Sequence, residues 1–317
     1  MIPSLLSRVL PAPGSPSADL YFMNACGDFL ERGVTRLAPT VFVSASACLV
    51  IRHGLGAGPL PPRRRLIYFL DDLPQAGIAD PSLPFRYRQK LRLVEAAALA
   101  QYGPRADLVV SSANLSRMTG RAAPVIHPYW SERIACQRHF ARVLDGRGPI
   151  DIAFLGSSVH RGGLAFLAPV IERVLAAEPR ARFHLAERHR LPPMLAAHPR
   201  VQRIPGRGWR AYRKGLTARR FHIALYPLIE TPFNMARSRN KLIEHGVAGA
   251  APIYTAAWGP SGLAARSGAG LALANCPALW ADAVLRLISR PWEAKEMAAG
   301  AGALARKLDD PAPQRDL

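Results

Sequence analysis

The sequence predicts an α/β protein made of two Rossmann-like domains. Its 317 residues are enough for two domains of ordinary size. Short apolar runs alternate with longer helical patterns, as in proteins with parallel sheets. The turn-forming segment Asp145–Pro149 contains no core-forming side chain and separates two such series. We therefore expect one domain over residues 1–148 and a second over residues 149–317.

The first domain is expected to hold four strands and one long helix. Apolar and β-branched residues bounded by turn residues predict the strands, at 40–44, 65–70, 107–111 and 124–127. The helix is expected over 87–102, where Leu91, Val94, Ala98 and Leu99 recur at helical spacing. This apolar side would cover one face of the sheet.

The second domain repeats the alternation of strands and helices. Strands are expected at 152–155, 182–186, 221–226, 251–255 and 270–273. Helices are expected at 163–177, 237–248 and 279–288, the last before a short tail. Open parallel sheets bind ligands at the carboxyl ends of their strands, so the residues that follow these strands are the candidates for function.

Composition and charge narrow the class of partner. With 49% hydrophobic and 20% charged residues, wholesale disorder is excluded. The net charge of +20 and the pI near 11.0 favour phosphorylated ligands, polyanions or acidic membrane surfaces. The excess is spread along the chain, and its densest cluster is only Arg63–Arg65. No RNA-recognition or helix-turn-helix signature occurs, so no specific nucleic-acid partner is expected.

Other motifs are informative by their absence. The four cysteines form no CxxC pair, which excludes a zinc ribbon and favours reduced, cytoplasmic thiols. The histidines form no HExxH and the serines no GxSxG elbow, so metalloprotease and hydrolase chemistry is excluded and no metal is expected. The first residues lack the pattern of a secretory signal, and the apolar stretch 41–51 falls short of the roughly 20 residues of a membrane span.

The segment 227–246 is the most informative part of the chain. It follows a predicted strand and enters a helix, and at about 100° per residue several polar side chains share one arc. Cations would bind phosphates and the carboxylate would accept from ribose hydroxyls. These candidate residues for a nucleotide diphosphate are Asn234, Arg237, Ser238, Lys241 and Glu244. The alternative is a solvated helix face stabilised by the Lys241–Glu244 pair.

A glycine turn after the strand at 152–155 is a second candidate. Backbone N–H groups and a cation near a helix start can bind a pyrophosphate. The residues are Gly156, Ser157, His160 and Arg161. The turn is not a G-x-G-x-x-G motif, and glycine turns of this kind usually serve only as a tight strand–helix connection, which is the alternative here.

Two acidic residues and two aromatic residues complete the candidates. Asp71 and Asp72 follow the strand at 65–70 and could orient or deprotonate an acceptor hydroxyl, or else cap a turn before Pro74. Trp209 and Tyr212 could pack over a nucleotide base, with core packing as the alternative.

These residues together resemble group 1 (family 4-like) GT-B glycosyltransferases. The order Pro-Leu, Thr-Pro-Phe-Asn, Arg-Ser, Lys and Glu over 227–244, followed by the Pro-containing strand 249–255, is similar to the donor-binding core of that family. Further similar segments follow in the family's order at 68–72, 106–112, 125–128, 152–160 and 280–288. The resemblance covers about residues 65 to 290 and implies a GT-B fold whose two domains face a cleft.

The resemblance implies a metal-independent enzyme without a cofactor. A nucleotide-diphospho-sugar would bind the second domain, and a carbohydrate or lipid-linked acceptor the first, with retaining chemistry in surface polysaccharide or glycolipid synthesis. Such an enzyme would be cytoplasmic, with peripheral attachment to an anionic inner membrane face as an extension. Many family members carry two glutamates seven residues apart, and here Ala236 stands at the first position. Two rivals stay open: a nucleotide-sugar epimerase on the same fold, and a non-catalytic or polyanion-binding protein.

Overall fold

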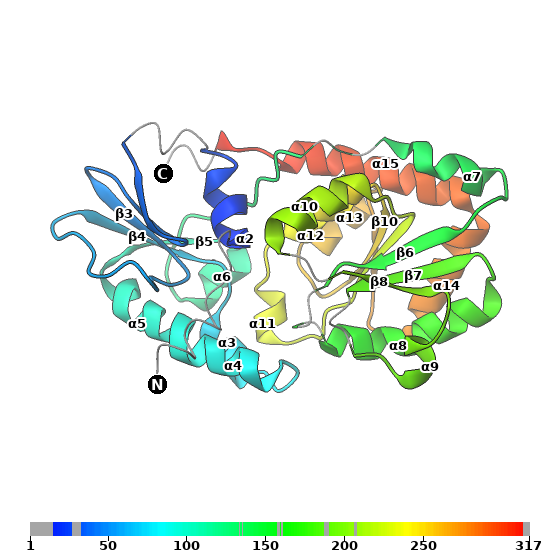
Figure 1. Ribbon diagram of the computed structural model, residues 1–317, viewed down its shortest axis with the longest axis horizontal. Coiled ribbons are helices and arrows are strands. Elements are labelled where there is room, and N and C mark those ends of the chain that lie inside the picture. Colours follow the sequence, from blue (N-terminus) through cyan, green and yellow to red (C-terminus); the bar gives the residue numbers. More distant parts are fainter. Residues whose placement is uncertain are drawn as a thin grey trace. The chain divides into compact units, whose positions relative to one another are not determined.

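The computed structural model describes residues 15–26, 33–132, 134, 136–156, 159, 161–186, 190–205 and 208–312. The chain divides into two compact units (Figure 1). The first comprises Met1–Ser131, Ala236–Arg239 and Asp310–Leu317, and the second comprises Glu132–Met235 and Asn240–Asp309. Each unit contains one β-sheet with parallel strands and several helices, so the predicted α/β class is confirmed.

The sheet of the first unit has five strands in the order β1-β2-β3-β4-β5. They are β1 (Thr35–Ala38), β2 (Val41–Val43), β3 (Ala47–Ile51), β4 (Arg65–Leu70) and β5 (Asp107–Val110). The first three pair antiparallel, because the connections between them are too short for a crossover helix. The pairs β3–β4 and β4–β5 are parallel, so their carboxyl ends lie at one edge.

The helices of the first unit include the one predicted at 87–102. It runs without a break through α4 (Phe85–Lys90), the π-helical turn η2 (Leu91–Ala96) and α5 (Ala97–Tyr102). Ala98 and Tyr102 pack in the core of this unit with strand residues such as Val110. The other helical elements are α2 (Pro16–Ala18), η1 (Asp19–Met23), α3 (Pro74–Ala79), η3 (Gly103–Arg105) and α6 (Ala113–Met118).

Two expectations for the first unit need correction. The strand expected at 124–127 is reduced to a single parallel bridge between Val125 and Val110. The strands β1 and β3 were not expected, because β1 has only two apolar residues, Leu37 and Ala38, and β3 continues the apolar stretch of β2 after Ser44 and Ser46. Together with β2 they form the antiparallel part of the sheet.

The sheet of the second unit is fully parallel, with six strands in the order β11-β10-β9-β6-β7-β8. They are β6 (Ile150–Phe154), β7 (Ala181–Ala186), β8 (Val201–Ile204), β9 (Ile223–Tyr226), β10 (Ala251–Thr255) and β11 (Leu271–Leu273). The strand order reverses between β6 and β9, which is the topological switch point of a Rossmann sheet. Every residue of β9 and β10 is buried, as expected for strands with both faces covered.

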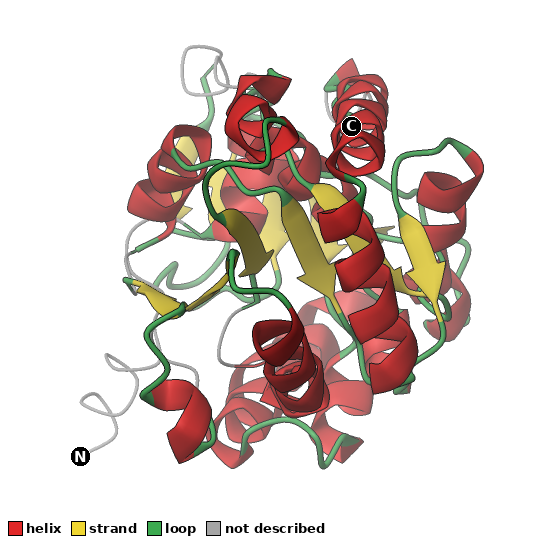
Figure 2. Ribbon diagram, turned by 90° about the vertical axis from the view of Figure 1, so that its right-hand side faces the viewer, coloured by secondary structure: helices red, strands yellow, loops and turns green. Residues whose placement is uncertain are grey.

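Helices cover both faces of this second sheet (Figures 1 and 2). One layer contains α8 (Arg161–Ala177) and α14 (Pro277–Ser289), which pack against each other. The other contains α10 (Trp209–Ala218), α12 (Asn240–Ala248) and α15 (Pro291–Leu308), and α12 packs along α15. Shorter helices are α7 (Ala141–Leu144), α9 (Pro193–Ala196), α11 (Pro232–Met235), α13 (Ser261–Arg266) and the 3-10 turn η4 (Gln137–Phe140).

The expected boundary between residues 148 and 149 falls inside the second unit. Both η4 and α7 pack against α15. Phe140 and Val143 belong to the same core as Ile150 and Ala298. The turn at 145–149 therefore joins a helix to a strand of one unit, and local turn composition alone does not distinguish this from a linker.

Candidate functional site

The switch point of the second sheet is closely packed around two glycines. Gly156 follows β6, and a Cβ there would lie 2.6 Å from the ring of Phe154. Gly163 lies in the first turn of α8, and a Cβ there would lie 2.8 Å from the carbonyl oxygen of Pro227, which follows β9. The two strands at the point of reversal thus meet the start of α8 without room for a side chain. Close helix–strand packing of this kind is what the later glycines of dinucleotide-binding turns provide.

Lys241 and Glu244 form a buried pair at the same edge of the sheet. The Lys241 Nζ donates to the carbonyl oxygen of Leu155, 2.6 Å away at the end of β6, and to Glu244 Oε1 at 2.7 Å. Glu244 is 3% exposed. Asn240 Nδ2 lies 3.5 Å from the second carboxylate oxygen. The alternative of a solvated helix face is therefore wrong for these two residues, because their charges are buried, although the Lys241–Glu244 pair that it included does form.

Tyr212, from α10, contacts the same carboxylate oxygen as Lys241. Its hydroxyl donates to Glu244 Oε1, and its ring stacks on Trp209 at a centroid distance of 6.0 Å. Burial, together with the nearby Glu244, raises the pKa of the Tyr212 phenol well above its usual range, so the hydroxyl stays protonated. Tyr212 also lines a pocket of about 40 Å³ at the ends of β6 and β8, with Leu155, Ile204, Pro205 and Leu216 among its other walls.

The remaining residues predicted for this edge lie in different environments. Asn234, in α11, is buried and donates from Nδ2 to the Ile229 carbonyl oxygen at 2.9 Å. Arg161 is the first residue of α8. Ser157 and His160 lie outside the described residues.

The predicted helix at 237–248 starts later than expected. Helix α12 begins at Asn240, and residues 236–239 belong to the first unit. There Ser238 Oγ accepts from the hydroxyl of Tyr21 at 2.8 Å, and Arg237 Nη1 lies 3.9 Å from Asp72 Oδ1. The common helical arc predicted for Arg237, Ser238, Lys241 and Glu244 is therefore wrong, because the first two are not in the helix.

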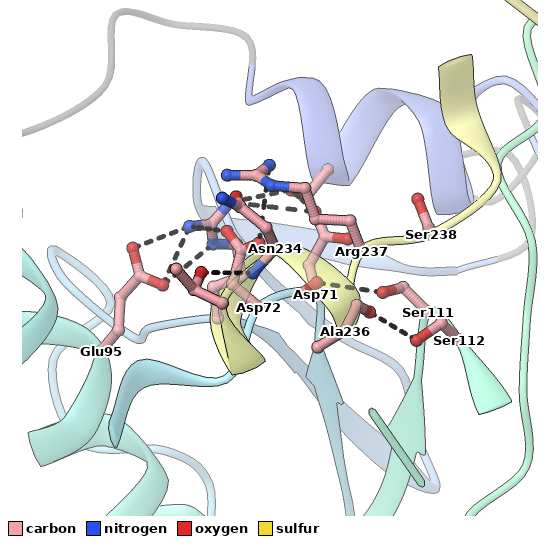
Figure 3. Close-up of polar contacts among 12 residues, drawn as sticks. Asp71, Asp72, Glu95, Ser111, Ser112, Asn234, Ala236, Arg237 and Ser238 are labelled. Atoms are coloured by element: carbon pink, nitrogen blue, oxygen red, sulfur yellow. Dashed lines mark hydrogen bonds and ion pairs between the residues drawn. The ribbon is translucent and has the colours of Figure 1, made fainter. Parts of the chain in front are cut away.

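A second polar cluster lies at the carboxyl ends of β3, β4 and β5 in the first unit (Figure 3). Asp71 and Asp72 follow β4, and Arg52 follows β3. Arg52 Nη2 lies 2.9 Å from Asp72 Oδ2 and also 2.9 Å from both carboxylate oxygens of Glu95. Asp71 accepts from the Ser17 hydroxyl at 2.6 Å. Arg52 thus holds Asp72 directly, and its Nη1 lies 3.8 Å from Asp71 Oδ2.

The two aspartates experience opposite electrostatic environments. Burial and the adjacent charge of Asp72 raise the pKa of Asp71 above its usual value. The pKa of Asp72 is lowered despite its burial, because Arg52 and Arg237 stabilise its charged form. Two neighbouring carboxyl groups with pKa values moved apart can act as proton acceptor and fixed charge. Arg52 itself has a φ of 63°, an unusual backbone conformation for a side chain of this size.

Sequence reasoning missed Arg52 and Glu95. A signal for Glu95 was available, since it is four residues after Leu91 and three before Ala98, and so lies on the apolar side of its helix. Arg52 directly follows an apolar strand, as the aspartates do. The residues around Arg52 in the sequence do not indicate its role, because its partners follow β4 or lie in the helix at 85–102.

The described ranges contain neither a metal-binding cluster nor a membrane-spanning helix. No group of three His, Cys, Asp or Glu side chains among them is arranged to hold a metal ion. No helix there is both long and apolar enough to cross a membrane.

Solved structures show which fold this is. The chain is similar to WaaG, a glycosyltransferase involved in lipopolysaccharide biosynthesis, with a TM-score of 0.58 and 16% identity over 80% of this chain and 77% of WaaG. It is similar to Anabaena Alr3699/HepE in complex with UDP-glucose, with a TM-score of 0.55 and 15% identity over 80% and 71% of the two chains. It also matches TarM with a TM-score of 0.58 and 12% identity, over 80% of this chain but 49% of TarM.

These similarities confirm the GT-B-like fold that the sequence motifs imply, and with it the resemblance to group 1 GT-B glycosyltransferases at the level of the fold. No protein-family model matches the sequence, and no curated protein matches it either.

Proposed function

We propose that this GT-B protein is a glycosyltransferase that moves a sugar from a nucleotide-diphospho-sugar to a hydroxyl acceptor. The observation that carries the proposal is the buried pair of Lys241 and Glu244 at the switch point between β6 and β9, where Rossmann sheets bind nucleotides. The solved structure of HepE with UDP-glucose, on the same fold, supports a nucleotide-sugar as the donor class.

In this proposal the donor binds the second unit. Lys241 supplies a cation for a phosphate, and Gly156 and Arg161, the first residue of α8, supply N–H groups at the start of a helix. Glu244 accepts from the ribose. Asn234 completes the proposed donor contacts of this unit, whereas Arg237 and Ser238, the other two residues expected there, belong to the first unit. Sugar transfer of this kind needs no resident cofactor, and we propose that it retains the anomeric configuration and uses no metal.

The acceptor is proposed to bind the first unit, beside Asp71 and Asp72. The raised pKa of Asp71 suits a group that takes a proton from a hydroxyl, while ionised Asp72 is held by Arg52. Surface polysaccharide or glycolipid synthesis is the proposed context, and the similarity to WaaG supports it.

Peripheral attachment to an anionic membrane is the second part of the proposal. Along the helix from α4 into η2, Phe85 is 64% exposed and Leu93 is 72% exposed, and the exposed Arg86 and Arg92 accompany them. Apolar and basic side chains exposed together on one helix suit a lipid interface. Binding to anionic vesicles should fall with salt and with Phe85→Ser/Leu93→Ser. Salt-insensitive binding by both proteins would refute this attachment.

A specific observation favours the non-catalytic alternative. Glu244 already accepts hydrogen bonds from Tyr212 and Lys241. The buried Ala236 stands at the position of the family's first glutamate. A GT-B protein that binds nucleotide-sugars without turnover would fit these facts.

The first experiment is thermal unfolding with UDP, GDP, ADP and their sugar conjugates. A ligand at about 100 times its Kd should stabilise the protein by about 2.7 kcal/mol. Lys241→Met should abolish the shift, whereas Lys295→Met, an exposed lysine in α15, should keep it. No shift with any nucleotide would refute donor binding. Nucleotide release only with an added acceptor would support transfer, while sugar isomerisation without release would indicate an epimerase.

A further inference from the structure

The carboxylate proposed to bind ribose already has a neutral hydroxyl donor from its own chain. Tyr212 and Lys241 both donate to Glu244 Oε1, and the Tyr212 side chain comes from α10, not from the helix that holds the other two. Glu244 is 3% exposed, so a nucleotide hydroxyl can take the place of the phenol on Oε1 only if the Tyr212 side chain moves away. The contact is therefore more than a surface hydrogen bond.

The Tyr212 hydroxyl is chemically similar to the ligand group that it would exclude. A phenol and a ribose hydroxyl each offer one O–H donor to a carboxylate. Exchange of one for the other keeps the buried charge of Glu244 hydrogen-bonded, and leaving it without either donor would be unfavourable. The pocket lined by Tyr212, Leu155 and Leu216 provides space next to the tyrosine.

We infer that the Tyr212 hydroxyl occupies the ribose position on Glu244, so that Tyr212 competes with the nucleotide and sets the ribose dependence of donor binding. The inference rests on the proposed function, since it assigns a specificity-determining residue to the same site. A nucleotide with its ribose hydroxyls replaces the phenol. A nucleotide without them leaves the phenol in place and binds through its phosphates and base.

The test compares Kd values for UDP and 2′,3′-dideoxy-UDP by calorimetry, with the GDP and ADP pairs measured in parallel. In the wild type the two nucleotides should have similar Kd values, because a ribose hydroxyl only replaces the existing hydrogen bond from Tyr212 to Glu244. In Tyr212→Phe the ring and its stacking on Trp209 remain, but Glu244 loses a donor. The ribonucleotide should then bind about tenfold more tightly or better, as expected for a hydrogen bond to a charged group, and the dideoxy form should be unchanged.

Two further variants separate this effect from general damage. Tyr254→Phe removes another buried phenol of the second unit, whose hydroxyl lies 3.5 Å from the Lys241 carbonyl oxygen, and should leave the ratio of the two Kd values unchanged. In a Glu244→Gln background, Tyr212→Phe should no longer tighten ribonucleotide binding, because the competition is for the carboxylate.

The outcomes distinguish this inference from the proposed function. If a ribonucleotide binds the wild type and Tyr212→Phe changes its Kd by less than about twofold, the competition is refuted and donor binding stands. If no nucleoside diphosphate binds either protein, both are refuted. If Tyr212→Phe does not fold, the wild type alone decides: a preference of more than about thirtyfold for UDP over its dideoxy form would refute the competition.

Discussion

Replacement of Arg52 by methionine should destabilise the first unit far more than replacement of an exposed arginine. Arg52 makes three contacts of 2.9 to 3.2 Å with Glu95, a carboxylate that is 2% exposed, and one of 2.9 Å with Asp72. After the substitution Glu95 keeps Lys90 at 3.1 Å, and among the described residues Asp72 keeps an ion pair with Arg237 at the longer distance of 3.9 Å. Removing one partner of a buried ion pair costs about 3–5 kcal/mol of stability. Because the Lys90 contact survives, we expect Arg52→Met to lower the free energy of unfolding by about 3 kcal/mol.

The assay should report the first unit alone, because a chain of two units need not unfold in one step. Amide hydrogen exchange of β3 and β4, read by mass spectrometry, gives the free energy of opening for that sheet. Arg65→Met is the matched control: Arg65 and Asp107 also form an ion pair, at 2.6 Å, but both side chains are more than half exposed. The control should cost less than about 1 kcal/mol. Equal losses in the two variants would refute the claim that Arg52 stabilises a buried network.

Three further predictions concern packing, a buried histidine and pH. Gly163→Ala should lower both the Tm and the free energy of unfolding, the latter by about 1–3 kcal/mol, because the new Cβ would lie 2.8 Å from a carbonyl oxygen. Gly215→Ala in α10, where a Cβ would have no neighbour within 4 Å, should raise the Tm. His245 is fully buried, and neither ring nitrogen has a hydrogen-bond partner among the described residues. Burial, together with the nearby Lys241, lowers the pKa of this imidazole well below 6.5. The wild type should therefore lose stability as pH falls below about 6.5, and His245→Phe should reduce that loss in pH-dependent unfolding. Asp72, whose pKa is lowered, stabilises the folded state above pH 3.8, and this stabilisation is lost as the pH falls through its folded-state pKa. Asp71, whose pKa is raised, destabilises the folded state once the pH rises through the raised pKa of Asp71. At pH 7 Asp72→Asn should thus speed exchange of the first unit and Asp71→Asn should slow it; the same sign for both would contradict the assigned shifts.

The sequence pattern correctly predicted the helices and strands that are determined by their own residues. The strands at 65–70 and 251–255 are apolar runs between turn residues, and both occur at those positions. The helix at 163–177 begins two residues earlier, at Arg161. Its seven buried residues include Leu164 and Leu167, which recur at the helical period.

The candidate site was predicted less well, since its arrangement depends on distant partners. Lys241 and Glu244 were correctly placed together on a helix, three residues apart, but nothing local indicates that the lysine reaches the carbonyl of Leu155. The polar segment 236–239 continues the helical pattern in sequence, yet it is held in the first unit by Asp72 and Ser112. Tyr212 was predicted to pack over a base or in the core, and its contact with Glu244 joins residues 32 positions apart.

The place of Ala236 gives a physical reason for the chain's departure from the two-glutamate pattern. Ala236 is 1% exposed and lies in the apolar core of the first unit with Val110 and Leu115. Its carbonyl oxygen accepts from the Ser112 hydroxyl at 2.5 Å, which fixes the backbone at that point. A glutamate there would bring a carboxylate among apolar side chains, and burial of such a charge without a partner costs several kcal/mol. In this arrangement a small apolar residue at 236 is therefore a requirement of the first unit's packing, so sugar transfer by this chain would have to position the donor sugar without a carboxylate at 236.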